Sequence, residues 1–186
     1  LQGGRRGTGR VSRFPVIDPG TEYYGGGGDT LVEFDNTTAE TKFATNKHAL
    51  AVVSIKKDIE EFRVATTHFT WTPDGQPDGA QRQSLASLLP LLAREPELLL
   101  CGDFNAPRGG EIFTALASRY TDNIPPHYEG SIDVSLHRAG QRDGERLGHL
   151  MVDGLFTTPG YVATEVRLEF GVSDHAAIVA TVAHKA

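Results

Sequence analysis

The order of strand-like and helix-like segments predicts an α/β fold. Apolar and β-branched runs typical of strands occur in both halves of the chain, and one segment between them carries leucines at helical spacing. A short apolar run followed by a polar loop and a second helix-like segment predicts a strand–loop–helix corner in the middle of the sequence. The sequence has no internal repeat and no sign of a second core, so we expect a single domain.

Composition limits the class of protein and of partner. The 186 residues, of which 39% are hydrophobic and 23% charged, suffice for one domain with a sizeable core. Cys101 is the only cysteine, so neither an internal disulfide nor a cysteine-based metal site can form. With a net charge of −6, no global positive field draws the protein onto nucleic acid or anionic lipid. We expect no membrane span, because no apolar run approaches the roughly 20 residues that one needs.

The N-terminal region is polar and rich in glycine. Leu1–Arg10 has almost nothing to bury, which predicts a disordered end before a domain over residues 11–186. We expect a short strand over Val11–Ile17, ended by the turn tripeptide Asp18-Pro19-Gly20. Gly25–Gly28 mark a flexible loop without the Lys-Ser/Thr ending of a phosphate-cradling loop. The chain opens with neither an initiator Met nor a secretory signal, which points to a truncated start rather than to a compartment.

Strands and one long helix are expected next. Leu31–Phe34, Ala49–Ile55 and Phe62–Phe69 are strand-like, and the last two are separated by a charged segment, as in an antiparallel hairpin. After Asp78, four leucines between residues 85 and 92 recur at helical spacing. Pro90 is expected to kink or end this helix before its last turn.

The second half of the chain predicts a buried strand, a short helix and three further strands. Leu98–Cys101 suits a strand buried on both faces, and Glu111–Ala117 suits a short helix. Residues 118–147 form a long polar connection of the kind that often carries substrate contacts. The strands expected in the last third are Leu150–Phe156, Ala163–Phe170 and Ala176–Val182.

The first segment that carries chemistry is Gly102-Asp103-Phe104-Asn105, directly after a buried strand. Side chains at the end of such a strand meet solvent on a rigid sheet. The spacing of two puts Asp103 and Asn105 on one face if the strand continues, where they can act on one phosphate or metal. An Asx turn that simply closes the strand fits the same residues equally well.

Ser173-Asp174-His175 is the second such segment. Adjacent residues of an extended chain point to opposite sides, so Asp174 cannot orient His175 within one Ser-His-Asp triad. An oxygen ligand for a hard cation beside a nitrogen that moves a proton or contacts phosphate would satisfy this arrangement. The alternative is a Ser-capped turn with a surface histidine.

Two further residues stand out by their surroundings. Asp153 is a lone carboxylate in an apolar strand, where an unpaired charge is costly, so we expect it to hydrogen-bond an imidazole, and His175 is the attractive partner. His68 lies at the end of the second hairpin strand, where a histidine by itself is more often a satisfied core or rim residue than a functional one. Arg82 and Arg108 are candidate phosphate contacts, although arginines at such places are more often solvated.

These segments, in this order, resemble the endonuclease/exonuclease/phosphatase superfamily. The family's Gly-Asp-x-Asn and Ser-Asp-His signatures match residues 102–105 and 173–175, and its Ile-Asp-Tyr-Ile-Phe strand is similar to Val152–Phe156. Its Thr-His-Leu strand end resembles Thr67-His68-Phe69, and its Ser-Arg-x-Pro strand resembles Ser12–Pro15.

The resemblance departs from the family pattern at two places. Family members place an Asn-bearing strand and a strand ending in the principal metal-binding Glu before the Ser-Arg-x-Pro strand, and only eleven residues precede Ser12 here. We therefore expect the N-terminal third of the family's domain to be lacking, with weaker Mg²⁺ binding and slower hydrolysis than in a version extended upstream. Gly154 also replaces the usual aromatic after Asp153, which predicts a gap beside the Asp153–His175 pair.

The resemblance implies an α/β four-layer sandwich of two mixed β-sheets flanked by helices, with the N-terminal strands missing. It implies a phosphoester hydrolase of phosphodiesterase or nuclease type, in which water attacks phosphorus in line with the help of Mg²⁺ or Mn²⁺. The implied metal ligands are Asp174 and Asp103. The implied catalytic residues are His68, Asp103, Asn105, Asp153 and His175.

The roles implied for these residues differ. Asp103 would orient or deprotonate the water, Asn105 would hold the water and a phosphate oxygen, and His175, steadied by Asp153, would contact phosphate. His68 would be a second phosphate contact or the acid for the leaving group. We expect a monomer whose partner is a phosphoester: nucleic acid, a phospholipid headgroup or a small phosphodiester. Two alternatives are a catalytically impaired remnant that binds phosphoesters without turnover, and a non-catalytic α/β adaptor.

Overall fold

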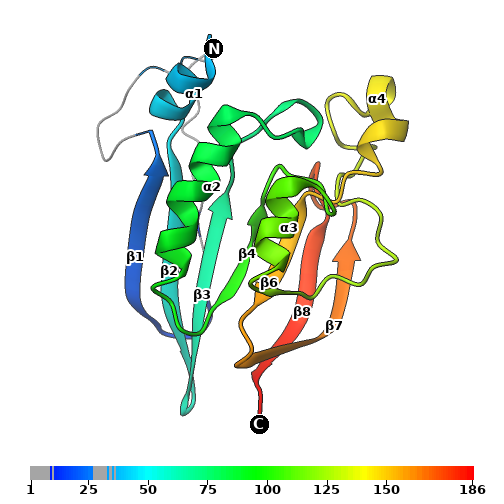
Figure 1. Cartoon of the computed structure of the whole chain (residues 1–186). Helices are drawn as coiled ribbons and strands as arrows, with labels where there is room; N and C mark the ends of the chain where they lie inside the picture. The colour runs from blue at the N-terminus through cyan, green and yellow to red at the C-terminus, as the bar shows by residue number, and fades with distance from the viewer. Residues whose placement is uncertain (1–8, 10, 27–32, 34, 36) are drawn as a thin grey trace.

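Two β-sheets form the framework of the part of the chain that the structure describes (Figure 1). The computed structural model describes residues 9, 11–26, 33, 35 and 37–186. The larger sheet has six strands in the order β1-β2-β3-β4-β6-β5, and the smaller one pairs β7 with β8. The strands are β1 (Val16–Gly25), β2 (His48–Lys57), β3 (Glu60–His68), β4 (Leu99–Asp103), β5 (Thr121–Asp122), β6 (Asp153–Thr157), β7 (Tyr161–Glu169) and β8 (Ala177–His184).

Helices cover one face of the larger sheet. Figure 1 shows α2 and α3 lying across its strands, with α4 at the end where β4 and β6 approach the loop before β8. The described helices are α1 (Ala39–Thr45), the short 3₁₀ helix η1 (Pro73–Gly75), α2 (Gly79–Leu92), α3 (Glu111–Ala117) and α4 (Gly140–Leu147). The predicted α/β class is confirmed, and none of these helices is both long and apolar enough to cross a membrane.

Alternation along β4 separates two cores. Leu100 and Phe156 point to the helix side, where they pack with Leu88 and other buried side chains of α2 and α3. On the opposite face, Leu99 and Leu155 pack against the β7–β8 sheet. The continuous apolar run of β4 thus has a partner layer on each face, as its sequence predicts.

The predicted hairpin is present, but the first strand differs from its prediction. β2 and β3 pair antiparallel from Leu50 opposite Thr67 to Lys57 opposite Glu60. β1 does not end at Asp18-Pro19-Gly20. Its pairing with β2 continues to Gly25 across a register shift between Ile17 and Gly20, because a bulge accommodates the tripeptide while the flanking residues keep their ladder partners. Of the predicted strand Leu31–Phe34 only Glu33 is described, and Gly27 and Gly28 of the predicted glycine loop lie outside the described residues. The predicted disordered end Leu1–Arg10 also lies outside them, except for Gly9.

The long helix also passes its expected end. Asp78 caps α2 by accepting a hydrogen bond from the amide of Gln81 at 2.8 Å. The helix continues through Pro90 to Leu92, so an end before the last turn, one of the two outcomes expected at Pro90, is wrong. Leu88 and Leu92 are both fully buried in the helix-side core, and their burial offsets the one backbone hydrogen bond that Pro90 cannot donate.

The polar connection over residues 118–147 is more structured than expected. It contains the short strand β5 and the helix α4. Arg108 holds its first part through an ion pair with Asp122 at 2.9 Å and a hydrogen bond to the carbonyl of Ile124 at 2.9 Å. Arg82 pairs with Glu111 at 2.8 Å. Both arginines considered as phosphate contacts therefore make structural ion pairs.

A close approach between strands explains one glycine of the Gly-Asp-x-Asn segment. Gly102 has a φ of +152°, and a Cβ there would overlap the carbonyl oxygen of Thr67 on β3.

Gly102→Ala should lower the free energy of unfolding by about 3 kcal/mol or more, because the backbone of β3 or β4 must shift to admit the Cβ. Gly109 is the matched control, since it also has a positive φ, of +86°, but its Cβ position is open. Gly109→Ala should cost about 1 kcal/mol, the backbone strain alone. Urea unfolding measures both, and equal losses would contradict the proposed overlap.

Candidate active site

Strand register places three titratable side chains in one row. His68 at the end of β3 is opposite Asp103 on β4, and Asp103 is opposite Asp153 on β6. Asp103 lies two residues beyond Cys101 and therefore points to the same face, toward the β7–β8 sheet. His68 Nε2 and Asp103 Oδ2 are 3.5 Å apart. Residues 35 positions apart in sequence thus meet because neighbouring strands end together.

His175 reaches this row from the loop between β7 and β8. Its Nδ1 lies 2.7 Å from Asp153 Oδ2, so the hydrogen bond predicted from the sequence is present. Asp153 is only 8% exposed, and the imidazole is the partner that its buried carboxylate requires. Asp174, the preceding residue, is exposed at the rim.

A serine and an aspartate that sequence reasoning missed hold this loop. Asp133 Oδ2 accepts a hydrogen bond from the amide of Gly171 at 2.7 Å, and the Asp133 amide donates to the carbonyl of Asp174 at 3.0 Å. The carbonyl oxygen of Ser131 accepts a hydrogen bond from the amide of Ala176 at 2.8 Å, and its hydroxyl accepts one from the amide of Asp153 at 3.2 Å. The only sequence signal for these residues was the expectation that the long polar connection carries functional contacts.

The structure shows the Asx turn in the Asp103–Asn105 segment and also places both side chains at one cavity. Asp103 Oδ1 accepts a hydrogen bond from the amide of Asn105 at 2.8 Å, so the segment forms an Asx turn, and Asn105 has a φ of +48°. The Asn105 side chain donates to the carbonyl of Phe69 at 2.9 Å, and both side chains line the same cavity. The turn closes the strand and fixes the two polar groups where they face the cavity.

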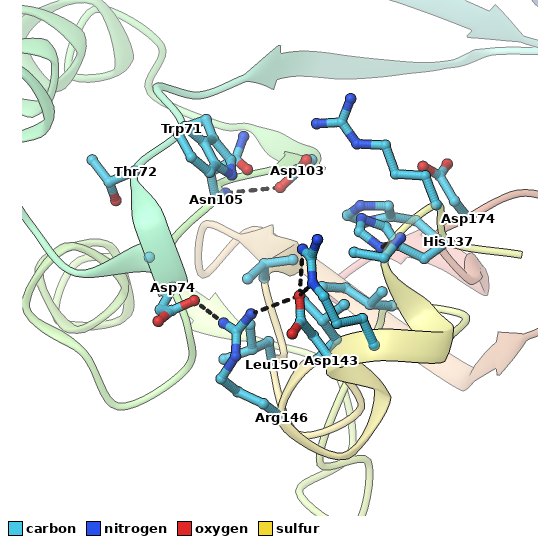
Figure 2. Close-up of a pocket in the computed structure, with 18 of the residues that line it drawn as sticks. Trp71, Thr72, Asp74, Asp103, Asn105, His137, Asp143, Arg146, Leu150 and Asp174 are labelled. Atoms are coloured by element: carbon cyan, nitrogen blue, oxygen red, sulfur yellow. Dashed lines mark hydrogen bonds and ion pairs between the residues drawn. The ribbon is translucent and has the colours of Figure 1, made fainter. Parts of the chain in front are cut away.

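A cavity of about 770 Å³ brings together most of the candidate site residues (Figure 2). His68, Asp103, Asn105, Asp174 and His175 line it, and Asp153 contacts it through His175. Its other lining residues are Trp71, Thr72, Asp74, Gly75, Ile132, His137, Arg138, Ala139, Arg142, Asp143, Arg146, Leu147, Leu150 and Val152.

The gap expected at Gly154 is absent. An ideal Cβ there would lie 2.7 Å from the ring of Phe104, and closer still to that of Phe156. These two rings pack edge to face, with centroids 5.3 Å apart. They occupy the space on the helix side of β6, and a side chain at residue 154 would displace them.

The environment shifts the pKa of two of these groups. Burial raises the pKa of Asp103 to about 6, the nearby Asp153 carboxylate adds to this, and the charges of His175 and His68 oppose it. The hydrogen bond to Asp153 raises the pKa of His175 to about 9, against the effect of burial. His175 is therefore a cation at neutral pH, while Asp103 titrates close to neutrality.

The carboxylates at this point suit a divalent cation, whereas the protonated His175 ring has no lone pair to offer one. One ligand atom from each of Asp103, Asp153 and His175 lies within 4.8 Å of the others. Two carboxylates held this close repel each other, as the raised pKa of Asp103 reflects, and a cation would relieve that repulsion. Asp174 lines the same cavity but does not belong to this cluster of described residues.

The geometry agrees with a family assignment. The model of the Endonuclease/Exonuclease/phosphatase family matches residues 1–175. The chain belongs to this family. Membership supports a phosphoester hydrolase of the nuclease or phosphatase type. No curated protein matches the sequence.

Solved structures of low identity share the fold of this family member. An endonuclease/exonuclease/phosphatase from Bacteroides vulgatus is 14% identical with a TM-score of 0.63, and the match covers 92% of this chain and 67% of that one. The catalytic domain of human nocturnin, solved with bound sulfate, is 18% identical with a TM-score of 0.53, over 93% and 61% of the two chains. A mannosyl-6-phosphatase from Bacteroides thetaiotaomicron is 13% identical with a TM-score of 0.56, over 91% and 67%.

The hydrogen bond between Asp153 and His175 should be visible in the pKa of His175. In metal-free protein, NMR should show the pKa of His175 at about 9, and Asp153→Asn should lower it toward its ordinary value of 6.5. Because the folded pKa is raised, the stabilisation from this pair is fully present below about pH 6.5 and is lost as pH rises through about 9. Glu129→Gln, which removes an exposed carboxylate paired with His149, should leave the His175 titration unchanged. An unaltered titration in Asp153→Asn would contradict the assignment.

The hydrogen bond from the Gly171 amide to Asp133 should protect that amide from exchange with solvent. Asp133→Asn should raise the solvent exchange rate of the Gly171 amide roughly tenfold, because an amide nitrogen in place of Oδ2 cannot accept its hydrogen bond. Ser135→Ala serves as the control, since it removes only the hydroxyl that donates to Asp133 Oδ1. Exchange of the Gly171 amide that is as slow in Asp133→Asn as in the control would show that the carboxylate does not hold the loop.

Proposed function

We propose that this chain is a metal-dependent phosphoester hydrolase of phosphodiesterase or nuclease type, in which water attacks phosphorus in line. The observation that carries the proposal is the convergence of His68, Asp103, Asn105 and His175 on one cavity from three separate parts of the sheet framework. Family membership supports the coarser class of reaction.

Asp103 is the proposed base or orienting group for water. Its pKa of about 6 lets it hold or take a proton near neutral pH. The Asn105 amide fixes Oδ1, so Oδ2, on the side of His68, is the oxygen that faces a water molecule. Asn105 uses one hydrogen of its side-chain nitrogen on the carbonyl of Phe69, and the second can be donated to the water or to a phosphate oxygen.

His175 is the proposed charge-stabilising group. With a pKa of about 9 it is an imidazolium at neutral pH, and Asp153 holds Nδ1, which leaves Nε2 to donate toward a phosphate oxygen. His68, with 59% of its side chain exposed, is free to reach the substrate as a second phosphate contact or as the acid for the leaving group.

The proposed cofactor is Mg²⁺ or Mn²⁺. When bound, such an ion neutralises charge that develops on the phosphorus oxygens. Asp174 and Asp103 are the ligands that the family resemblance implies, and the neighbouring Asp153 carboxylate offers a further oxygen close to Asp103. The proposed substrate class covers nucleic acid, phospholipid headgroups and small phosphodiesters.

The proposal predicts metal-dependent ester cleavage. Wild-type protein with Mn²⁺ should release 4-nitrophenol from bis(4-nitrophenyl) phosphate, and chelator should abolish the release. His175→Ala and Asp103→Asn should each lower the rate by roughly a hundredfold to a thousandfold, because each removes a group that acts in the transition state. His149→Ala is the matched control, since His149 is exposed and does not line the cavity.

Three outcomes separate the alternatives. Release that survives the chelator, or that is equal in Asp103→Asn and wild type, would refute the mechanism. Binding of Mn²⁺ and of the ester without release would identify a catalytically impaired remnant. No binding of either would favour a non-catalytic adaptor.

A further inference from the structure

A basic wall faces the proposed reaction centre across the cavity. Arg138, Arg142 and Arg146 recur at intervals of four residues in and just before α4, and all three line the cavity. Figure 2 shows Asp103 and Asn105 on one side of the cavity and Asp143 and Arg146 on another. The reaction that we propose uses none of these arginines.

Two carboxylates only partly neutralise this wall. Asp143 accepts from Arg142 at 2.7 Å and lies 3.6 Å from Arg146, which also pairs with Asp74 of η1. Arg138 has no ion pair with any residue that the structure describes. The ion pairs hold Arg142 and Arg146 in place, and one guanidinium remains to bind an anion from the cavity.

His137 adds a donor beside Arg138. Its Nδ1 accepts the amide of Ala139 at 3.2 Å, so the neutral imidazole carries its proton on Nε2. His137 lines the cavity, and a guanidinium next to an imidazole N–H is a donor set for phosphate oxygens.

The size and charge of the cavity favour a compact ligand. A volume of about 770 Å³ lies in the range of small-molecule sites, which is roughly 300–1,000 Å³. Asp74, Asp143 and Asp174 line the same space, and the chain has a net charge of −6, which disfavours a long polyanion such as nucleic acid.

We propose that Arg138 and His137, supported by Arg142 and Arg146, form a second phosphate-binding subsite, so that the substrate is a small molecule with a phosphate group besides the one that is cleaved. This inference rests on the proposed function, because it takes the scissile phosphate to lie beside Asp103 and His175. The second phosphate would bind without reacting and would set which ester enters the cavity.

Calorimetry with matched ligands tests the subsite. The probes are propane-1,3-diol bisphosphate and the corresponding monophosphate, titrated in the same Mg²⁺ buffer into wild type, R138Q, R138K and R119Q. Wild type should bind the bisphosphate roughly tenfold or more tightly than the monophosphate, since charge-assisted hydrogen bonds add to its binding. R138Q should lose this preference while keeping its affinity for the monophosphate, and R138K should retain part of it. Arg119, which is exposed and hydrogen-bonds Ala115 and Ser118 at the end of its own helix, is the matched control, so R119Q should behave as wild type.

The outcomes distinguish this subsite from the proposed reaction. Equal affinity of wild type for both probes, no binding of the bisphosphate, or equal losses for both probes in R138Q would overturn the subsite. A short single-stranded oligonucleotide that binds more tightly than the bisphosphate and loses affinity in R138Q would overturn the choice of a compact ligand. If the bisphosphate preference depends on Arg138 but no chromogenic ester is cleaved, the subsite stands and the hydrolase proposal fails.

Discussion

The pairing register of β4 with β6 is the constraint on which the site depends. It sets Asp103 opposite Asp153, so two carboxylates face the same layer of the molecule at the buried end of the sheet. A slip of one residue in this pairing would turn one of the two carboxylates toward the helix-side core, where Leu100 and Phe156 now lie, and would separate the pair. Burial and mutual repulsion make this pair unfavourable by itself, and the imidazolium of His175 supplies the charge that compensates for it. The raised pKa of Asp103 and that of His175 are thus two consequences of one arrangement.

That compensation requires the loop before β8 to be held in place. His175 belongs to the smaller sheet's connection, whereas its partner Asp153 belongs to the larger sheet. Ser131 joins the two, since its hydroxyl accepts a hydrogen bond from the amide of Asp153 and its carbonyl accepts one from the amide of Ala176. Asp133, two residues later, holds the loop through Gly171 and Asp174. The segment therefore belongs to the supporting structure of the site, although it lies in the most irregular part of the chain. Several of these hydrogen bonds involve backbone amides, which every residue except proline offers, so the neighbouring side chains can vary. For this reason no strong sequence motif marks the segment.

Sequence patterns predicted the elements in which local secondary-structure propensity and tertiary packing favour the same structure. The hairpin of β2 and β3, the doubly buried β4 and the helix Glu111–Ala117 follow from periodicity and strand propensity alone. The errors arose where tertiary packing overrides a local signal: Leu92 keeps α2 intact beyond Pro90, and ladder pairing with β2 turns Asp18-Pro19-Gly20 into a bulge. The Asp153–His175 bond was predictable because a buried charge needs a partner. The contribution of Asp133 was not, because its partner is a backbone amide that any residue would offer.

The two walls of the cavity are built in different ways, and this difference bears on how such a site acquires specificity. Asp103 and Asn105 stand on a strand end fixed by an Asx turn and by both cores, so their geometry is rigid. The opposite wall, with Arg138 and Arg146, comes from the polar connection between β5 and β6, where both arginines are exposed and belong to neither core. Chemistry common to a family can then be kept by the sheet while the connection changes which substrate is admitted. The ion pair between Arg146 and Asp74 connects this wall to η1, the short helix after β3, which lines the same cavity.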